Sequence, residues 1–396
     1  MASRKLRGKW REGCENHLPS PLVLVVLALV VCYVQVPNLP NSNGHPRLSA
    51  SASGAGGVVK SHRSFVPALP STRVLRARRK RRGTVWIPSL NRLLFESDEI
   101  NIDDDEGGAA GTSYFVDLPM DDYRAVHVKD ILGTESGEEV RVGVVDAGKC
   151  DNATVQWRES GLRIDLSPGG EGGELAQSLL QKVDDRDRPD VELLLALPRP
   201  RVFERLLPVI AQSGVRKLFV AGSAKVDTSY WSTHMLNPTH TRHKDGLLKM
   251  REKLKEGLTQ SGDTALPTVR IVRNLEGFIT SGEDIEKDFP KDRYIRLVSH
   301  PSRPEQQASI GLPLIKRLYE LDMASLIDSQ DKRVLLAVGP DGGWEEPWEV
   351  ERFLEMGFIP FTLGERVLHT EVAVPVLVAL LHDWLDRGKA ALRKRD

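Results

Sequence analysis

Short apolar runs separated by turn residues mark the first part of the chain that has a structural pattern. Between Ser113 and Leu166 the runs alternate polar and apolar positions or are wholly apolar, as in Val140–Val145, Ala153–Trp157 and Leu162–Leu166. Such runs are typical of β-strands with one face against a core. Because several of them follow one another closely, the pattern predicts a small β-barrel.

A different rhythm begins at Glu192, where apolar runs alternate with segments of helical periodicity. Strands that alternate with helices favour an α/β fold, with a parallel sheet covered on both faces. The strands are expected at residues 192–197, 217–221, 269–272, 294–298, 334–338 and 359–363, and the helices at residues 201–212, 244–259, 347–356 and 371–387.

Glycine-rich segments suggest where the domains end. Ser167–Gly173 (SPGGEGG) is a flexible break, and Asp98–Gly111 is acidic and glycine-rich, as expected of an exposed loop. We therefore expect four parts, which are a targeting leader at 1–85, a barrel at 86–170, a linker at 171–190 and an α/β domain at 191–390.

The leader differs from the rest of the chain in charge. The 55 basic and 55 acidic residues balance, yet no Asp or Glu occurs from Asn16 to Phe95. The apolar run Pro21–Val36 is short for a membrane span and typical of a signal sequence. The acid-free continuation, rich in Ser, Ala and Arg, suits a transit peptide. These features predict a plastid protein in preference to a mitochondrial one, with no stable membrane association of the mature chain, and an N-terminal membrane anchor is the alternative.

The charge balance and the cysteines exclude some kinds of site. A neutral chain needs a local basic patch to bind nucleic acid, because its net charge gives no attraction. Cys14, Cys32 and Cys150 are far apart and form no CxxC pair, so neither a disulfide framework nor a cysteine zinc site is expected.

Three loops follow predicted strands at positions where parallel sheets bind ligands. They are Val298–Pro301, Val338–Gly343 and Leu363–Glu371. The middle loop, GPDGG, lacks the Lys-Ser/Thr of a Walker loop, and the chain has no GxGxxG fingerprint beside it. Glu345 and Glu346 open the next helix and would repel a phosphate. The loop therefore suits an uncharged or cationic ligand such as an adenosine that carries a sulfonium, and a tight turn without a ligand is the plainer interpretation.

Several spaced motifs carry a resemblance. They are Gly339–Gly343, then Glu349 and Glu351, then Gly357-Phe358, then Leu363–Ala373 (LGERVLHTEVA). Together they resemble the signature of the ribosomal RNA small subunit methyltransferase E family. Arg124–Leu132 and Leu195–Pro200 are more weakly similar to that family.

The resemblance implies a fold, a reaction and partners. The fold is a SPOUT α/β trefoil-knot methyltransferase domain, preceded by a PUA-like β-barrel that binds RNA. The methyl donor is S-adenosyl-L-methionine, and the product is 3-methyluridine in small-subunit ribosomal RNA. The enzyme is a homodimer with an active site shared between subunits. We expect no metal, because no second histidine or carboxylate stands at metal-ligand spacing beside His300.

The resemblance also implies which residues contact the cofactor. For the glycines the alternative role is turn geometry, and His300 fits a structural histidine equally well. The cofactor residues are expected to be Val298, His300, Val338, Gly339, Pro340, Gly342, Gly343, Leu363, Gly364, Val367, Leu368 and Thr370.

Arg366 and Glu371 are the candidate catalytic residues. Loss of the imide proton from uracil N3 gives an anion spread over O2 and O4, which a nearby cation stabilises. Arg366 is suited to that role, or to an RNA phosphate. Glu371 can orient Arg366, cap the last helix or accept the proton. Alternatively, alignment of the methyl donor with N3 supplies most of the rate without a dedicated base.

Candidate RNA contacts occur in both domains. An aromatic side chain can stack on an unpaired base, and the alternative is an ordinary loop with buried aromatic residues. The basic run Lys244–Lys255 is expected to be a solvated face or an RNA contact. The candidates are Arg124, His127 and Lys129 in the barrel, and Lys225, Tyr230 and Trp231 after a predicted strand.

Some residues depart from the family pattern. His369 replaces an arginine, Val372 a threonine and Gly133 an arginine, Asp263 stands where many members have arginine, and Asp341 stands in place of glutamate. The lost positive charges leave two alternatives open. One is a knotted methyltransferase that acts on another RNA site, and the other is an RNA-binding ribosome-assembly factor without turnover.

Overall fold

A computed structural model describes residues 92–103, 113–166, 178–280, 283–301, 304–313 and 315–394. The expected leader, with its apolar run and its organelle signals, lies outside these residues. Within the described part of the chain, no helix combines the length and the apolar character that crossing a membrane requires.

The N-terminal part of the described chain is a six-stranded sheet with the order β1-β4-β5-β6-β3-β2. Only the β1–β4 pair is parallel, and the other neighbours are antiparallel. Strands β1 and β2 are the two ends of this ladder, and the PUA-like barrel stays a prediction. The strands are β1 (Leu93–Phe95), β2 (Asn101–Asp103), β3 (Ser113–Pro119), β4 (Glu139–Val144), β5 (Lys149–Arg158) and β6 (Gly161–Asp165).

The start of the expected exposed loop at residues 98–111 is ordered. The short helix η1 (Ser97–Glu99) and strand β2 occupy it, and Ile102 pairs with Tyr114 of β3. All three residues of β2 are exposed, so the strand has no hydrophobic alternation that a sequence pattern could reveal. Pairing with β3, rather than a hydrophobic pattern of its own, makes this segment a strand.

The C-terminal sheet has seven strands, and every neighbouring pair is parallel, which confirms the predicted α/β class. The order is β11-β13-β10-β12-β7-β8-β9. All residues of the central strands β7 and β12 are buried, as expected when both faces of a sheet are covered. The strands are β7 (Val191–Ala196), β8 (Val215–Ala221), β9 (Thr268–Val272), β10 (Tyr294–Ser299), β11 (Lys316–Arg317), β12 (Arg333–Val338) and β13 (Ile359–Thr362).

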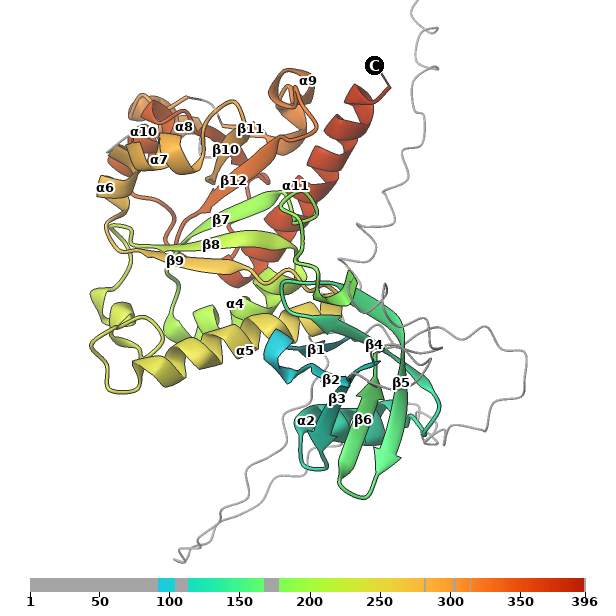
Figure 1. Ribbon diagram of the computed structural model, residues 1–396. Coiled ribbons are helices and arrows are strands. Elements are labelled where there is room, and N and C mark those ends of the chain that lie inside the picture. The colour runs from blue at the N-terminus through green and yellow to red at the C-terminus, as the bar shows by residue number, and fades with distance from the viewer. Residues whose placement is uncertain are drawn as a thin grey trace, which may run out of the picture. The chain divides into compact units, whose positions relative to one another are not determined.

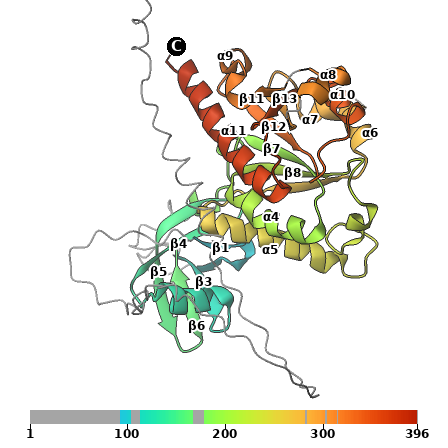
Figure 2. The same cartoon turned by 180° about the vertical axis from the view of Figure 1, so that it is seen from behind.

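Helices cover the two faces of this sheet. Helix α11 passes behind the sheet in Figure 1 and in front of it in Figure 2, which is the view from behind. Helices α6, α7 and α10 lie on the other side of the sheet from α4 and α5. The helices are α4 (Pro200–Gln212), α5 (His243–Ser261), α6 (Leu275–Thr280), α7 (Glu283–Asp288), α8 (Pro304–Ser309), α9 (Met323–Leu326), α10 (Trp348–Glu355) and α11 (Thr370–Leu392).

The basic face of α5 is neutralised by carboxylates. Glu96 accepts hydrogen bonds from Arg251 Nη2 at 2.8 Å and Lys255 Nζ at 3.0 Å. Two further basic residues of this run, Lys249 and Lys253, pair with Glu204 and Glu256. The run is therefore a face of ion pairs, which favours the structural interpretation over an RNA contact.

The sheet order places the three expected ligand loops at one edge. Strands β13, β10 and β12 are consecutive neighbours, and Ser299 at the end of β10 pairs with Val338 on one side and Phe361 on the other. Because these strands are parallel, the loops that follow them begin side by side. The fold thus brings together three segments that are separated by about 20 residues or more in the sequence.

Candidate functional site

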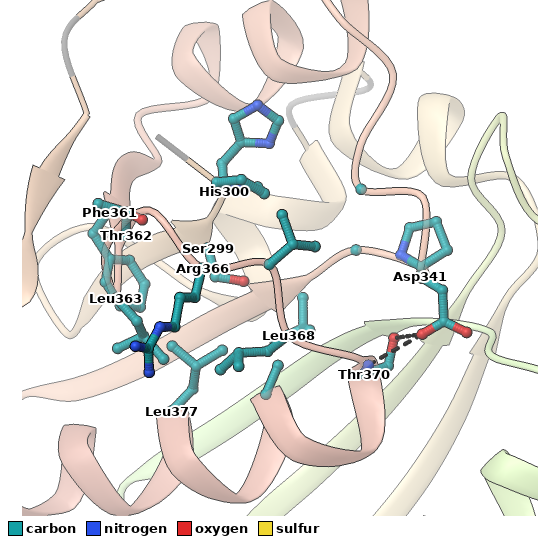
Figure 3. Close-up of a pocket in the computed structure, with 17 residues that line it drawn as sticks. Ser299, His300, Asp341, Phe361, Thr362, Leu363, Arg366, Leu368, Thr370 and Leu377 are labelled. Atoms are coloured by element: carbon teal, nitrogen blue, oxygen red, sulfur yellow. Dashed lines mark hydrogen bonds between the residues drawn. The ribbon is translucent and has the colours of Figure 1, made fainter. Parts of the chain in front are cut away.

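A cavity of about 90 Å³ lies among the loops that follow β10, β12 and β13, with the first turns of α11 as its floor (Figure 3). Most of its lining side chains are apolar, and main chain of the glycine-rich loop forms one wall. The lining residues are Ser299, His300, Pro301, Val338, Gly339, Pro340, Asp341, Gly343, Phe361, Thr362, Leu363, Arg366, Val367, Leu368, Thr370, Ala373 and Leu377.

The structure separates the expected cofactor residues into two groups. Those that line this cavity are His300, Val338, Gly339, Pro340, Gly343, Leu363, Val367, Leu368 and Thr370. Three of the expected residues do not line it. Val298 is fully buried inside β10, Gly364 lies between lining residues, and Gly342 lines a neighbouring cavity.

Glycine is required at two positions of the GPDGG loop for different structural reasons. Gly343 has a φ of +69°, a backbone conformation that residues other than glycine rarely adopt. Its N–H donates to Pro340 O at 2.8 Å. A Cβ on Gly342 would lie 3.3 Å from Lys225 Cδ. Turn geometry therefore accounts for Gly343, and the close approach of a lysine stem accounts for Gly342.

Asp341 caps helix α11 from the glycine-rich loop. The residue that precedes the helix, His369, provides no side-chain cap, whereas Asp341 Oδ1 accepts from Thr370 N at 3.1 Å and Thr370 Oγ1 at 2.9 Å (Figure 3). Burial alone would raise the pKa of Asp341, but the hydrogen bonds from Thr370 and the nearby charges of His369 and Arg199 lower it below 3.8. The aspartate thus fixes the helix start to the loop and puts a negative charge beside the cavity.

Arg366 is the only arginine or lysine among the residues that the structure describes around this cavity. Its side chain lies near Leu363 and Leu377, at the opposite end from Asp341 and Thr370 (Figure 3). It is exposed and makes no hydrogen bond or ion pair with another described residue. Its guanidinium can therefore bind a ligand without first breaking an internal contact.

The structure does not place Glu371 in this cavity, in contrast to the expectation of a catalytic role. Its Oε2 accepts from Arg205 Nη2 of α4 at 2.7 Å, and about half of its side chain is exposed. An acidic residue in the first turn of α11 also complements the helix dipole. Glu371 therefore joins two helices at the surface, and it makes no contact with Arg366.

His300 is enclosed beside the cavity. Only 5% of the residue is exposed, its Nε2 lies 2.5 Å from Glu346 Oε1, and its backbone N–H donates to Phe361 O. The ring is turned away from Arg366 (Figure 3). These contacts favour the interpretation of a structural histidine. Its backbone holds the loop after β10 to β13, and its ring holds the loop to Glu346.

A second, more polar cavity of about 260 Å³ adjoins the first. The two share His300, Pro301, Asp341, Gly343 and Val367, and the second is also lined by Lys225, Gly342, Trp344, Glu345 and Glu346. Lys225 Nζ donates to Gly342 O at 3.4 Å and Trp344 O at 3.1 Å, and lies 3.2 Å from Glu345 Oε2. This expected RNA contact therefore also holds the glycine-rich loop.

The aromatic candidates after β8 are half-buried. Tyr230 and Trp231 belong to the short helix η3 (Thr228–Ser232), and both pack against the main core. The guanidinium of Arg273 lies 5.3 Å from the centre of the Trp231 ring. This packing agrees with the alternative of a loop with buried aromatic residues, and it leaves only part of each ring accessible.

Arg124, an expected RNA contact, is instead buried in an internal ion-pair cluster. It is buried, and its guanidinium donates to Glu99 Oε1 at 2.6 Å and Asp122 Oδ2 at 2.9 Å. These two carboxylates pair with the positive charge of Arg124, which the sequence had suggested would bind RNA. Of the other two barrel candidates, His127 is half-buried, whereas Lys129 is exposed with its Nζ 5.9 Å from the centre of the Trp157 ring.

Sequence reasoning did not name several residues of the first cavity. Ala373 and Leu377 follow Thr370 by three and seven residues, so helical periodicity places all three on one face of α11. That periodicity would have identified them. Ser299 and Thr362 end their strands, and only the strand register shows that they lie together. Phe361 was also not named, and Pro301 and Asp341 were placed in the expected loops and motifs but not among the cofactor residues.

Neither cavity offers a set of metal ligands. In the described ranges no three His, Cys, Asp or Glu side chains come close enough together to hold a metal ion.

The chain matches a known protein family and a known protein. Residues 186–382 match the model of the RNA methyltransferase domain family. The chain is 23% identical over 301 residues to ribosomal RNA small subunit methyltransferase E of Treponema pallidum (strain Nichols), an alignment that covers 74% of this chain and 93% of that protein.

Solved structures show more distant likeness. One is a ribosomal RNA small subunit methyltransferase E from Neisseria gonorrhoeae bound to S-adenosyl methionine, with a TM-score of 0.46 and 17% identity over 74% of this chain and 98% of that one. Another is a protein of Legionella pneumophila in complex with the cofactor SAM, with a TM-score of 0.45 and 16% identity over 74% of this chain and 97% of that one.

The matched domain contains every described residue that lines the cavity, and its motifs are those of the resemblance seen in the sequence. By this match residues 186–382 form an RNA methyltransferase domain, and the chain is similar to the ribosomal RNA small subunit methyltransferase E proteins.

Proposed function

We propose that this protein transfers a methyl group from S-adenosyl-L-methionine to N3 of a uridine in small-subunit ribosomal RNA. The observation that carries the proposal is the cavity itself. The three motif loops meet there, and Arg366 stands at one end with no internal partner among the described residues. The likeness to the Treponema enzyme supports the choice of RNA.

The lining of the cavity fits the proposed methyl donor. The apolar side chains of Val338, Leu363 and Leu368 suit the faces of an adenine ring, and glycine main chain can approach it closely. The negative charge of Asp341 at the other end favours a cationic ligand over a phosphate. S-adenosyl-L-methionine would supply an activated methyl group on a sulfonium.

Arg366 provides the chemistry that uracil requires. As N3 loses its proton, negative charge develops on O2 and O4, and a guanidinium near these oxygens stabilises it. Because Glu371 is bound to Arg205 and does not line the cavity, it is not placed to accept that proton. Bulk water can take the proton, and the chain then contributes mainly alignment and charge stabilisation.

We also propose that the enzyme acts as a homodimer. Val367 lines the cavity, Val372 lies in the first turn of α11, and these apolar residues are 59% and 43% exposed. Exposed apolar residues of this kind mark interaction sites when they adjoin a functional surface. A second copy of the chain would cover them and complete the wall of the site.

Methyl transfer to ribosomal particles tests the proposal. The full chain is incubated with S-adenosylmethionine labelled in the methyl group and with small or large ribosomal subunits that lack the modification. We expect label in the RNA of the small subunits alone. Label in the large subunits would redirect the enzyme to another RNA, and no label in either, with the cofactor bound, would favour an assembly factor without turnover.

A further inference from the structure

Glu349 lines neither of the two cavities. This residue of α10 is only 1% exposed, and in the described part of the chain its carboxylate has no arginine or lysine partner at ion-pair distance. A buried carboxylate without hydrogen bonds would strongly destabilise the folded protein. The contacts that satisfy Glu349 therefore determine its role.

Those contacts come from two separate loops. From the loop after β8, Ala224 N donates to Oε1 at 2.9 Å and Ser223 Oγ donates to Oε2 at 3.1 Å. From the loop after β12, Glu345 N donates to Oε2 at 2.6 Å. One side chain thus joins segments that lie more than 100 residues apart in the sequence.

The two loops carry different parts of the proposed site. The loop after β12 contains the glycine-rich wall of the first cavity, and the loop after β8 contains Lys225 and leads into η3 with Tyr230 and Trp231. Lys225 spans the same two loops at a second point through Gly342 O and Trp344 O. Whatever moves one loop must therefore move or strain the other.

The geometry points to Glu349 as a positioning residue that holds the glycine-rich wall of the first cavity and the loop with Lys225 together as a single rigid unit. It touches neither ligand. It acts through Ala224, Ser223 and Glu345, and for the identity of the two ligands the inference rests on the proposed function. Ordering of the glycine-rich loop by the cofactor is thereby transmitted to the loop that carries Lys225.

A conservative change breaks this arrangement without removing the side chain. Glu349→Gln replaces one acceptor oxygen with an NH₂ donor, so that either Ala224 N or Glu345 N faces another donor. Glu351→Gln is the matched control, because Glu351 is an exposed residue of the same helix. Ser223→Ala removes a single hydrogen bond and serves as a milder variant if Glu349→Gln does not fold.

Hydrogen exchange of the full chain, followed by mass spectrometry, tests whether Glu349 holds the two loops together, first without any ligand. We expect faster exchange at residues 222–227 and 339–346 in Glu349→Gln than in Glu351→Gln, with no change in β7. S-adenosylmethionine should protect both segments in the wild type and in Glu351→Gln, but only 339–346 in Glu349→Gln. The variant should also bind the cofactor about five-fold more weakly.

Equal exchange and equal cofactor affinity in the two variants would overturn the inference. Failure of cofactor binding, which the proposed function requires, looks different, because S-adenosylmethionine would then protect no segment even in the wild type. The comparison of the unliganded proteins would still decide whether Glu349 holds the two loops together.

Discussion

At the scale of single residues, Arg366 carries the proposed chemistry. Arg366→Ala should lower kcat for methyl transfer by about 10²-fold or more, because developing charge on the uracil oxygens loses its cation. Arg366→Lys should retain part of the rate, since an ammonium keeps the charge without the planar fork. Single-turnover methylation of small ribosomal subunits measures the effect.

The matched control for this arginine is Arg352→Ala, because Arg352 is exposed on α10 and pairs only locally with Glu355. Its rate should equal that of the wild type. If Arg366→Ala keeps the wild-type rate, Arg366 has no role in the chemical step and only alignment remains as the source of catalysis.

Asp341 should contribute to stability as a cap. Asp341→Ala leaves Thr370 N at the start of α11 without its acceptor, and it should reduce the free energy of unfolding by about 1 kcal/mol. The folded protein lowers the pKa of Asp341, so this contribution is present above the ordinary value of 3.8 and is lost as the pH falls through the folded value.

Urea unfolding at neutral and acidic pH measures this cap. The difference between wild type and Asp341→Ala should shrink below pH 3.8, whereas Asp341→Asn, which keeps an acceptor oxygen, should lie between them at neutral pH. A difference that stays constant with pH would mean that the carboxylate charge contributes nothing to the cap.

The residue types alone indicated where a site should be, but not how each side chain is used. Arg124 and Arg366 are both arginines in family-like motifs, yet Arg124 is satisfied by two carboxylates and Arg366 is not. Whether a charge is paired depends on neighbours brought in by the fold. For Glu371 the partner is Arg205, which is 166 residues away in the sequence.

At the scale of elements, the long buried strands and amphipathic helices of the C-terminal sheet were predictable. Helices α4, α5 and α11 and strands β7, β10 and β12 begin and end within a few residues of their expected bounds. The helices show a period of 3.6 residues, and the strands are short apolar runs bounded by turn residues. The short elements β2, β11 and α6–α9 lack such patterns, because distant pairing or packing forms them.

Helix α11 contains a histidine that should make stability depend on pH. Burial lowers the pKa of His382, although the hydrogen bond between its Nε2 and Gly214 O, at 3.0 Å, opposes the shift. The neutral ring therefore stabilises the folded state. This stability is complete above the ordinary value of 6.5 and is lost as the pH falls from there to the folded pKa.

Thermal or urea unfolding between neutral pH and pH 5 tests this dependence. The free energy of unfolding should fall by up to about 1.4 kcal/mol per pH unit below pH 6.5 from this group. His382→Asn should flatten that slope while lowering stability at neutral pH. An unchanged slope in the variant would show that other groups cause the dependence.

At the scale of the whole molecule, the proposed homodimer depends on exposed apolar residues near the site. Val372→Glu should convert a dimer into a monomer in light scattering, because a charge would replace an apolar contact. Val126→Glu is the control, since Val126 is 42% exposed and Val372 is 43% exposed. A monomeric wild type, or a dimeric Val372→Glu, would contradict the proposed interface.

The proposed function depends on which atom of which RNA receives the methyl group. The measurement is to incubate the full chain with labelled S-adenosylmethionine and unmodified small ribosomal subunits, digest the RNA and identify the labelled nucleoside by mass spectrometry. We expect label in 3-methyluridine, greatly reduced in Arg366→Ala. Label in any other nucleoside would contradict it and would assign this cavity to a different RNA methylation.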